Sequence, residues 1–403
     1  MTTYSERRTA LLFAAAQAMY QTASVAMVAV GGLVGLQLAP DPRLATLPLG
    51  MVMVAATASM IPAALFMQRY GRRMGFLLGC VLGMASGAVA TASVLLHSFN
   101  LFLIANALLG VYGAFAGYYR FAAADAVSLD FRSQALSWVV AGGVVAAVLG
   151  PAIVRYSSGV APELTSFLIP FVAMIVLGLI ALALVSRLHI PHATATTSAD
   201  AGEARPLQTI MQQPVFLAAL ASTTIGFAVM VMVMTATPIA MKLCGLPLSA
   251  STNVIQWHVL GMFVPSFFTG KLIQRVGVLP IIVTGALLFA AQVAINLSGV
   301  AYGNFVTALI LLGVGWNFLF IGGSTLLTQN YRPSERTRTQ AAHDFIVYGL
   351  SSAASLGAGG LLTALGWHAV NLVALPAVLL VLVAVGNLLW QRRVNAMAEV
   401  VGS

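Results

Sequence analysis

Long apolar runs separated by short polar segments make up most of the chain. A helix needs about 20 apolar residues to cross the hydrocarbon core of a bilayer. Charged residues, prolines and turn residues divide this sequence into twelve runs of that order. The expected spans are 9–37, 44–67, 75–97, 99–119, 134–155, 163–186, 214–241, 247–270, 278–299, 302–328, 340–365 and 367–390. We therefore predict an all-α membrane protein with twelve transmembrane helices.

One polar stretch, residues 188–213, is longer than the other interruptions and follows the sixth run. It holds two histidines, a run of Thr, Ala and Ser, and three charged residues. Such a composition is typical of a linker. We expect a cytoplasmic linker here, which joins an N-terminal six-helix half, residues 1–187, to a C-terminal six-helix half, residues 214–403.

Two short motifs recur at one spacing. Residues 68–71 (Gln-Arg-Tyr-Gly) follow the second run, and residues 274–277 (Gln-Arg-Val-Gly) follow the eighth. Residues 132–135 (Arg-Ser-Gln-Ala) stand at the start of the fifth run, and residues 338–341 (Arg-Thr-Gln-Ala) at the start of the eleventh. Both pairs lie 206 residues apart. The shared spacing indicates two duplicated six-helix repeats, an arrangement found in secondary transporters.

The few charged residues predict the orientation of the chain. Only 7% of the residues are charged and 60% are hydrophobic, so most of the surface has to face lipid. There are 19 Lys and Arg against 10 Asp and Glu. If both termini are cytoplasmic, the inside segments hold every basic residue except Arg43, Arg155 and Lys242. This positive-inside bias predicts a bacterial inner-membrane protein with cytoplasmic termini, and it explains the basic charge without nucleic-acid binding.

The sequence lacks the signatures of enzymes. We find no Ser/His/Asp set, no paired carboxylates, and no metalloprotease or phosphate-loop pattern. Two cysteines, Cys80 and Cys244, exclude a disulfide framework. Without a nucleotide-binding domain, the chain would draw its energy from an ion or substrate gradient. We expect a secondary transporter that carries no cofactor.

The loops after the second and eighth runs resemble the signature of the major facilitator superfamily, and Gly150-Pro151 resembles its antiporter-type motif. The resemblance covers the whole chain and implies the major facilitator fold, with alternating access between two six-helix repeats. Gln68 and Gln274 occupy positions that are usually acidic in this signature. The chain therefore departs from the usual charge relay. The loop residues have two candidate roles, gating of the transporter and simple anchoring at the membrane. These residues are Gln68, Arg69, Arg72, Arg73, Gln274 and Arg275.

Methionine and histidine residues in the seventh and eighth runs form a candidate metal site. Met230 and Met234 are four residues apart, as are His258 and Met262, so each pair shares a helix face. Neutral imidazole and thioether groups suit Cu(I), and thioethers bind without losing a proton. Methionine is also a common apolar gap-filler. A histidine deep in a membrane helix is a functional candidate by default, so our first interpretation is a ladder for transported copper.

The same four residues resemble the paired motifs of the CcoA-type bacterial copper importers, a branch of that superfamily. The resemblance implies copper import for the assembly of haem-copper cytochrome oxidases, with a cytoplasmic copper acceptor as partner. The branch also contains riboflavin transporters, so an organic substrate such as riboflavin is the alternative. Its contacts would be cavity residues in the first and eighth runs, namely Gln17, Tyr20, Gln21 and Trp257.

Three further residues are candidates for handling ions. His343 and Asp344 lie near the cytoplasmic end of the eleventh run, where they would suit a coupling proton. The alternative for Asp344 is an ion pair with Arg120 or Arg332. Cys244, near the outer end of the seventh run, would pass copper on as a thiolate, although a lone thiol is usually inert.

Overall fold

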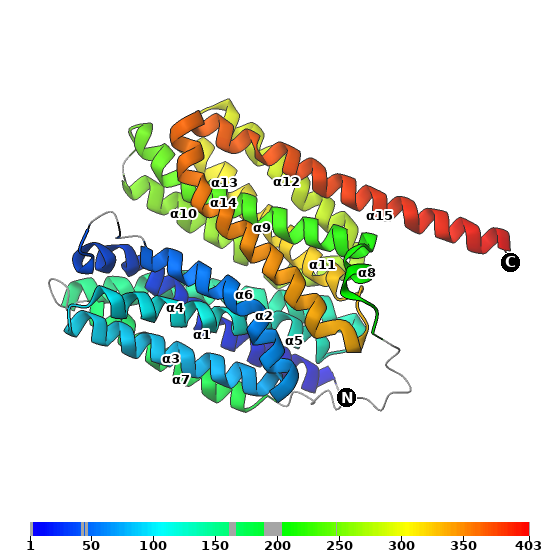
Figure 1. Ribbon diagram of the computed structural model, residues 1–403. Coiled ribbons are helices and arrows are strands. Elements are labelled where there is room, and N and C mark those ends of the chain that lie inside the picture. The colour runs from blue at the N-terminus through cyan, green and yellow to red at the C-terminus, as the bar shows by residue number, and fades with distance from the viewer. Residues whose placement is uncertain are drawn as a thin grey trace. The chain divides into compact units, whose positions relative to one another are not determined.

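The computed structural model describes residues 3–41, 44, 47–160, 167–188, 204–246 and 248–402. Most of these residues are helical, and the described part of the chain contains no β-strand. Contacts within the chain group it into two compact units, Met1–Thr197 and Ser198–Ser403. In each unit the helices run side by side (Figure 1). Helices satisfy their own backbone hydrogen-bonding groups, as a bilayer requires.

The N-terminal unit is built around α4, which lies against both α2 and α3, while α1 packs against α6 and α7. α4 begins after Ser98, whose Oγ accepts a hydrogen bond from the Leu101 amide (3.4 Å). A side-chain acceptor at this position satisfies an otherwise free helix donor. The helices of the unit are α1 (Thr3–Leu38), α2 (Leu47–Tyr70), α3 (Arg72–Leu95), α4 (Phe99–Ala116), α5 (Tyr119–Asp125), η2 (Leu129–Phe131), α6 (Arg132–Val160) and α7 (Leu168–Ser186).

The C-terminal unit is built around α13, which packs against α9, α10 and α12. α9 also contacts α14 and α15, and α12 contacts α15. The helices of the unit are α8 (Leu207–Met211), α9 (Pro214–Leu243), α10 (Leu248–Phe263), α11 (Ser266–Val276), α12 (Val278–Ser298), α13 (Tyr302–Leu327), η4 (Pro333–Glu335), α14 (Arg336–Leu372) and α15 (Ala374–Gly402).

The two units repeat one packing scheme. The contacts of α1 with α6, α2 with α4, and α3 with α7 recur as contacts of α9 with α14, α10 with α13, and α12 with α15. Equivalent glycines precede α3 and α12 with left-handed backbone, Gly71 at φ 88° and Gly277 at φ 89°. Glycine adopts this conformation without steric cost. These are the glycines that end the two recurring motifs, so the internal repeat extends to backbone geometry.

Eleven helices in the described part of the chain are long and apolar enough to cross a bilayer, against twelve expected spans. The eighth expected span, 247–270, is the difference, because it divides into α10 and α11 at Val264–Pro265. Proline has no amide hydrogen and disfavours helical backbone in the preceding residue. Asn317 Nδ2 of α13 donates to the Met262 carbonyl (2.6 Å) next to the break. The carbonyl beside the break therefore has a side-chain partner.

A glycine separates the last two expected spans, 340–365 and 367–390. α14 extends to Leu372, but Gly366 within it has a left-handed backbone (φ 78°) that interrupts the helix. This conformation is open to glycine at little cost. The division that the sequence placed at residue 366 is therefore a real break in the helix.

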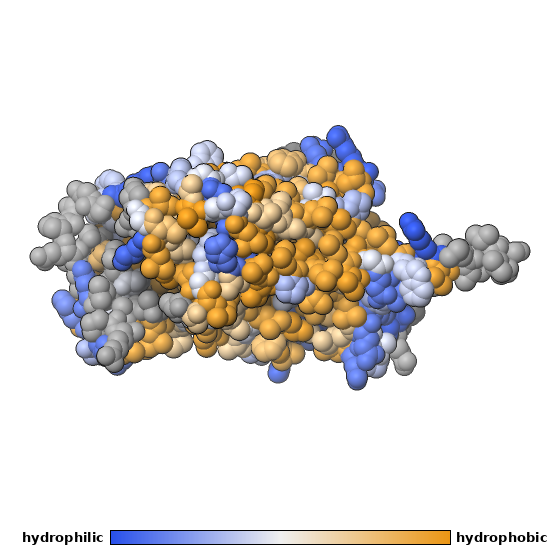
Figure 2. Space-filling model, turned by 90° about the horizontal axis from the view of Figure 1, so that it is seen from above, coloured by the Kyte–Doolittle hydropathy of each residue, from blue (hydrophilic) through white to orange (hydrophobic). Residues whose placement is uncertain are grey.

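Apolar side chains cover the outside of the helices. Large exposed hydrophobic residues include Leu65 on α2, Val176 on α7, Leu356 on α14 and Leu380 on α15. Figure 2 shows one face of the molecule, where apolar side chains dominate and hydrophilic ones gather mostly toward the ends. Contiguous apolar surface of this extent is typical of contact with lipid.

Candidate substrate and ion-coupling sites

Five aromatic side chains meet in the C-terminal unit, and we call them the aromatic cluster. They are Phe227 of α9, Phe263 of α10, Trp316 and Phe320 of α13, and Tyr348 of α14. Trp316 and Phe320 are stacked, with ring centroids 4.9 Å apart and an interplanar angle of 14°. The ring of Phe227 lies 6.0 Å from Trp316 and 5.4 Å from Tyr348. Sequence analysis missed this cluster, because aromatic residues in a wholly apolar helix carry no signal of which side they face.

The aromatic cluster adjoins polar groups whose hydrogen-bonding capacity is not used. Trp316 is 3% exposed, and its indole Nε1 has no hydrogen-bond partner among the described residues. The same holds for the buried hydroxyls of Thr224 on α9 and Ser324 on α13. A buried donor without a partner costs about 1–3 kcal/mol. Phe227 and Tyr348 are half-buried, so two rings of the cluster are partly accessible.

The predicted cavity residues of the first run lie on α1. Gln17 and Gln21 are one turn apart and half-buried, and their side-chain oxygens have no partner among the described residues. The ring of Tyr20 packs edge-on to Tyr112 of α4 at 4.9 Å. Trp257, predicted with them, is 52% exposed on α10. The two glutamines are therefore acceptors available to a polar ligand in the N-terminal unit.

The four predicted copper ligands lie on α9 and α10. Met230 and Met262 are buried, and Met234 is half-buried. His258 is fully buried, and its Nδ1 lies 2.8 Å from the Leu309 carbonyl oxygen of α13. Because a carbonyl only accepts, Nδ1 carries the hydrogen. Nε2 is then a buried acceptor with no partner among the described residues.

α10 and α13 approach closely where His258 lies. A Cβ atom placed on Gly313 would lie 2.5 Å from the His258 carbonyl oxygen and 2.8 Å from the Met262 nitrogen. Close packing of α10 on α13 is therefore a sufficient reason for His258 and Met262 to be buried. Within the described residues, no group of three or more His, Cys, Asp or Glu could hold a metal ion. The thioether ladder stays a prediction.

Cys244, the predicted relay thiol, caps the C-terminal end of α9. Its amide donates to the Ala240 carbonyl (3.0 Å), and the residue is exposed. Exposure leaves the thiol accessible to solutes, but a role in metal transfer stays a prediction.

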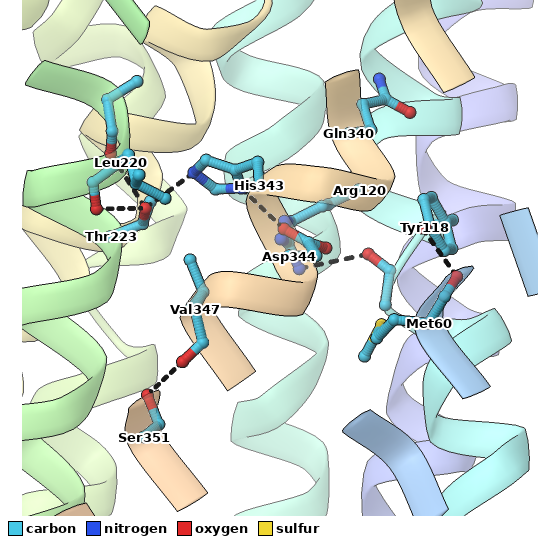
Figure 3. Close-up of polar contacts among 12 residues, drawn as sticks. Met60, Tyr118, Arg120, Leu220, Thr223, Gln340, His343, Asp344, Val347 and Ser351 are labelled. Carbon is cyan, nitrogen blue, oxygen red and sulfur yellow. Dashed lines mark hydrogen bonds and ion pairs between the residues drawn. The ribbon is translucent and has the colours of Figure 1, made fainter. Parts of the chain in front are cut away.

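A hydrogen-bonded chain joins α9 to α14 within the C-terminal unit (Figure 3). His343 Nε2 lies 2.8 Å from Thr223 Oγ1, and His343 Nδ1 lies 2.8 Å from Asp344 Oδ1. All three residues are fully buried. The ring of Phe216 packs edge-on against the imidazole at 6.2 Å. The two predicted proton carriers are thus in contact with each other and with a hydroxyl that the sequence did not single out.

Loop residues of the N-terminal unit contact the ends of later helices. Arg72 forms an ion pair with Asp125 at the end of α5 (2.9 Å), with side chains 11% and 7% exposed. Arg73 donates to the Ser186 carbonyl at the end of α7. Arg69 lies over the ring of the adjacent tyrosine at 5.5 Å. These contacts fix the turn between α2 and α3.

The equivalent turn of the C-terminal unit lacks two of those charges. Val278 and Leu279 stand where the N-terminal unit has two arginines. Gln68, Gln274 and Arg275 are exposed. The repeat therefore keeps the glycine and one arginine of this turn but not the two arginines that follow the glycine, and a gating role for the loop residues stays a prediction.

A separate ion pair anchors the end of the linker to the C-terminal unit. Arg205 contacts the Glu335 carboxylate through Nε (2.8 Å) and a terminal nitrogen (2.6 Å), and its backbone amide donates to the same group (2.9 Å). Hydrogen bonding to Glu335 raises the pKa of the Arg205 guanidinium, so that side chain stays charged. The two residues are 130 positions apart, and no local pattern pairs them.

Two repeated helical units with an apolar exterior define a multi-pass membrane protein built by internal duplication. The model of the Major Facilitator Superfamily matches residues 9–264 and 248–400. The chain belongs to that superfamily.

Named relatives of this chain are similar over nearly its full length. The riboflavin transporter RfnT of Brucella anthropi is 40% identical over 377 residues, which cover 94% of each chain. The uncharacterized MFS-type transporter YdeG of Bacillus subtilis is 26% identical, over 89% of this chain and 86% of that protein.

Solved structures of the superfamily share the fold. A proton:xylose symporter has a TM-score of 0.76 at 13% identity and covers 94% of this chain and 95% of its own. A bacterial homologue of the iron transporter ferroportin, in an outward-facing state, has a TM-score of 0.71 at 15% identity, over 94% of this chain and 98% of its own.

These findings confirm the expected superfamily and the all-α fold. The chain is a transporter and not an enzyme. Copper transport, our first interpretation, has no support among these findings, and neither have the oxidase-assembly role and the copper acceptor that came with it. The alternative, an organic substrate such as riboflavin, agrees with the 40% identical relative.

Proposed function

We propose that the chain is a secondary transporter of riboflavin, or of a flat heteroaromatic molecule of the same kind, in a bacterial inner membrane. The observation that carries the proposal is the 40% identity with a riboflavin transporter over 94% of each chain. Membrane location is supported by the eleven long apolar helices of the described residues.

The aromatic cluster supports a flat aromatic substrate. Stacking of a heterocyclic base on an aromatic side chain is worth about 1–3 kcal/mol, and Phe227 and Tyr348 are half-buried rings available for such contact. The unpaired Nε1 of Trp316 would donate to a carbonyl of the flavin ring system.

The charge pattern supports an orientation with both termini in the cytoplasm. Basic residues are concentrated in the segments that this topology places inside. The repeated units support alternating access, in which two similar helical bodies expose the substrate to one side and then to the other. Transport would then follow a gradient of substrate or of a coupling ion.

Riboflavin binding and uptake test the proposal. Riboflavin fluorescence, which stacking on aromatic rings quenches, is measured with purified protein, and uptake is measured in cells that lack their own riboflavin supply. Phe227→Ala is expected to weaken binding about 5- to 150-fold, the equivalent of one lost stacking contact. Trp316→Phe keeps a ring but removes the donor, so it is expected to weaken binding about 2- to 13-fold.

Trp390→Phe is the matched control, since Trp390 is an exposed tryptophan on α15. It is expected to bind and transport riboflavin as the unmodified protein does. Copper uptake is measured in the same cells. A chain that accumulates copper and does not bind riboflavin would contradict the proposal.

A further inference from the structure

Thr223, His343 and Asp344 form a buried hydrogen-bonded group, and the donors and acceptors at each contact limit where its hydrogens can lie. Thr223 Oγ1 lies 2.9 Å from the Ala219 carbonyl oxygen and 3.2 Å from that of Leu220. Carbonyl oxygens only accept, so in one arrangement that fits these distances the single hydroxyl hydrogen points toward them, as is common for threonine in helices. The hydroxyl oxygen then accepts a hydrogen bond from His343 Nε2, 2.8 Å away.

In that arrangement the imidazole of His343 has a hydrogen on Nε2, while Nδ1 faces a carboxyl oxygen. Nδ1 lies 2.8 Å from Asp344 Oδ1, which is a hydrogen-bond distance. Lone pairs on both atoms would repel, so one hydrogen lies between them. The pair is then imidazolium with carboxylate, or imidazole with carboxylic acid. Either form holds one proton more than a neutral imidazole next to a carboxylate.

Release of that proton requires a rearrangement at Thr223. With Asp344 ionised and His343 neutral, Nδ1 keeps the hydrogen that the carboxylate accepts, and Nε2 becomes an acceptor. The Thr223 hydroxyl then has to turn from the Ala219 carbonyl to Nε2 to keep its contact with the ring. Protonation of the pair is thereby tied to the rotation of one hydroxyl group on α9.

This group lies one helical turn from the aromatic cluster on both helices. Thr223 precedes Phe227 by four residues on α9, and Asp344 precedes Tyr348 by four on α14. Residues four apart lie on the same helix face. The rings of Phe227 and Tyr348 are 5.4 Å apart. The pair is therefore separated from the aromatic cluster by a single turn of two packed helices.

We propose that the His343–Asp344 pair takes up the proton that drives transport, and that Thr223 is a positioning residue that sets the imidazole tautomer. The inference rests on the proposed transporter function and adds the coupling ion to it. One proton enters the pair from water on one side and leaves to water on the other. No bond between heavier atoms forms or breaks.

Other charges on the helices around the pair are few. α8 and α12 contain no charged residue, α9 has only Lys242 near its far end, and α15 has charges only in its last turns. On η4, Glu335 is engaged by Arg205. Within the C-terminal unit, the other charged side chains near the pair in sequence are Arg332, Glu335, Arg336 and Arg338, and Arg205 is paired with Glu335.

Riboflavin accumulation in vesicles that contain the purified protein tests the coupling. With a pH gradient of one unit, one proton per substrate supports about tenfold accumulation. Asp344→Asn is expected to reduce the accumulation ratio to about one, while riboflavin exchange between the two sides persists. Accumulation near tenfold with an unchanged pH dependence would overturn the proposal. Recovery of accumulation in the double variant Asp344→Asn with Arg120→Gln would also overturn it, since Asp344 would then be only a counter-ion.

Variants of Thr223 test the positioning role. Thr223→Val removes the hydroxyl at nearly constant volume, so the protonated imidazole loses a hydrogen-bond acceptor. The pH profile of uptake is expected to change, because the imidazole loses its partner at Nε2 in both protonation states. Thr223→Ser keeps the hydroxyl and is expected to keep the profile. Identical profiles for the Val and Ser variants would contradict the role of Thr223.

Infrared difference spectra of the substrate-free protein separate this inference from the choice of substrate. Protonation of the pair is expected to give a pH-dependent carboxyl or imidazole band that Asp344→Asn removes. If the protein does not bind riboflavin but the band titrates, the proposed substrate is wrong and the proton site stands. If riboflavin is transported but no band distinguishes Asp344→Asn, the proton site is wrong.

Discussion

The close contact between α10 and α13 predicts that a larger side chain at Gly313 lowers the free energy of unfolding. Gly313 has no room for a methyl group, because an added Cβ would meet the His258 carbonyl oxygen at 2.5 Å and the Met262 nitrogen at 2.8 Å. Both atoms belong to the backbone of α10, so relief requires the two helices to separate. Gly313→Ala is therefore a substitution that removes close packing without removing any polar group.

The expected magnitude combines two opposed effects. Overpacking that forces backbone shifts costs up to about 3 kcal/mol, and sometimes more. Alanine in place of glycine in a helix contributes about 1 kcal/mol in the other direction. The net loss in unfolding free energy is about 2 kcal/mol. For a unit of about 200 residues this lowers Tm by about 4–8 °C.

Gly357→Ala is the matched control, because it lies inside α14 and an added Cβ would meet nothing within 4 Å. Only the propensity effect applies there, so Tm is expected to stay constant or to rise by up to about 4 °C. Thermal unfolding of both purified variants in one detergent is the measurement. Equal shifts for Gly313→Ala and Gly357→Ala would refute the close-packing argument.

Two further substitutions test other contacts. Arg72→Gln is expected to lower the unfolding free energy by about 1.5–3 kcal/mol, the worth of a hydrogen bond to a charged group, with partial recovery when Asp125→Asn is added. Thermal unfolding of the single and double variants measures this, and a single variant as stable as the parent protein would count against the ion pair. Met262→Leu conserves volume and is expected to cost less than about 1.5 kcal/mol, with riboflavin uptake unchanged. A selective loss of copper uptake in that variant would favour a thioether ligand over packing.

Helix positions could be predicted from the sequence because a bilayer demands long apolar runs, and few residues are able to interrupt them. Gly366 and the turn at Gly71 were placed correctly for that reason. The break at Pro265 was not anticipated, since the apolar run continues through it. Its local partner, Asn317, lies on another helix, and no spacing rule points to it.

The side-chain contacts could be predicted from the sequence much less well than the positions of the helices. His258 was given a metal role because an ionisable side chain in a membrane span is expensive, yet its Nδ1 has a backbone partner, the Leu309 carbonyl 51 residues away. The aromatic cluster was missed because helices that are apolar on all sides do not show which face is internal. By contrast, the sequence singled out His343 and Asp344, because adjacent ionisable residues are rare in such runs; the two side chains are in contact, and their role in coupling stays a prediction.

The way in which the break at Pro265 is counted determines the side of the membrane to which the later loops are assigned. α10 has 16 residues and α11 has 11, so they measure about 24 Å and about 17 Å, and neither alone covers a hydrocarbon core of about 30 Å. A count of long apolar helices gives eleven in the described residues, an odd number that would leave the two chain ends on opposite sides. Taken together as one bent crossing, α10 and α11 make the number even and return both ends to the same side. The sidedness of every segment after α11 thus depends on counting two short helices as one.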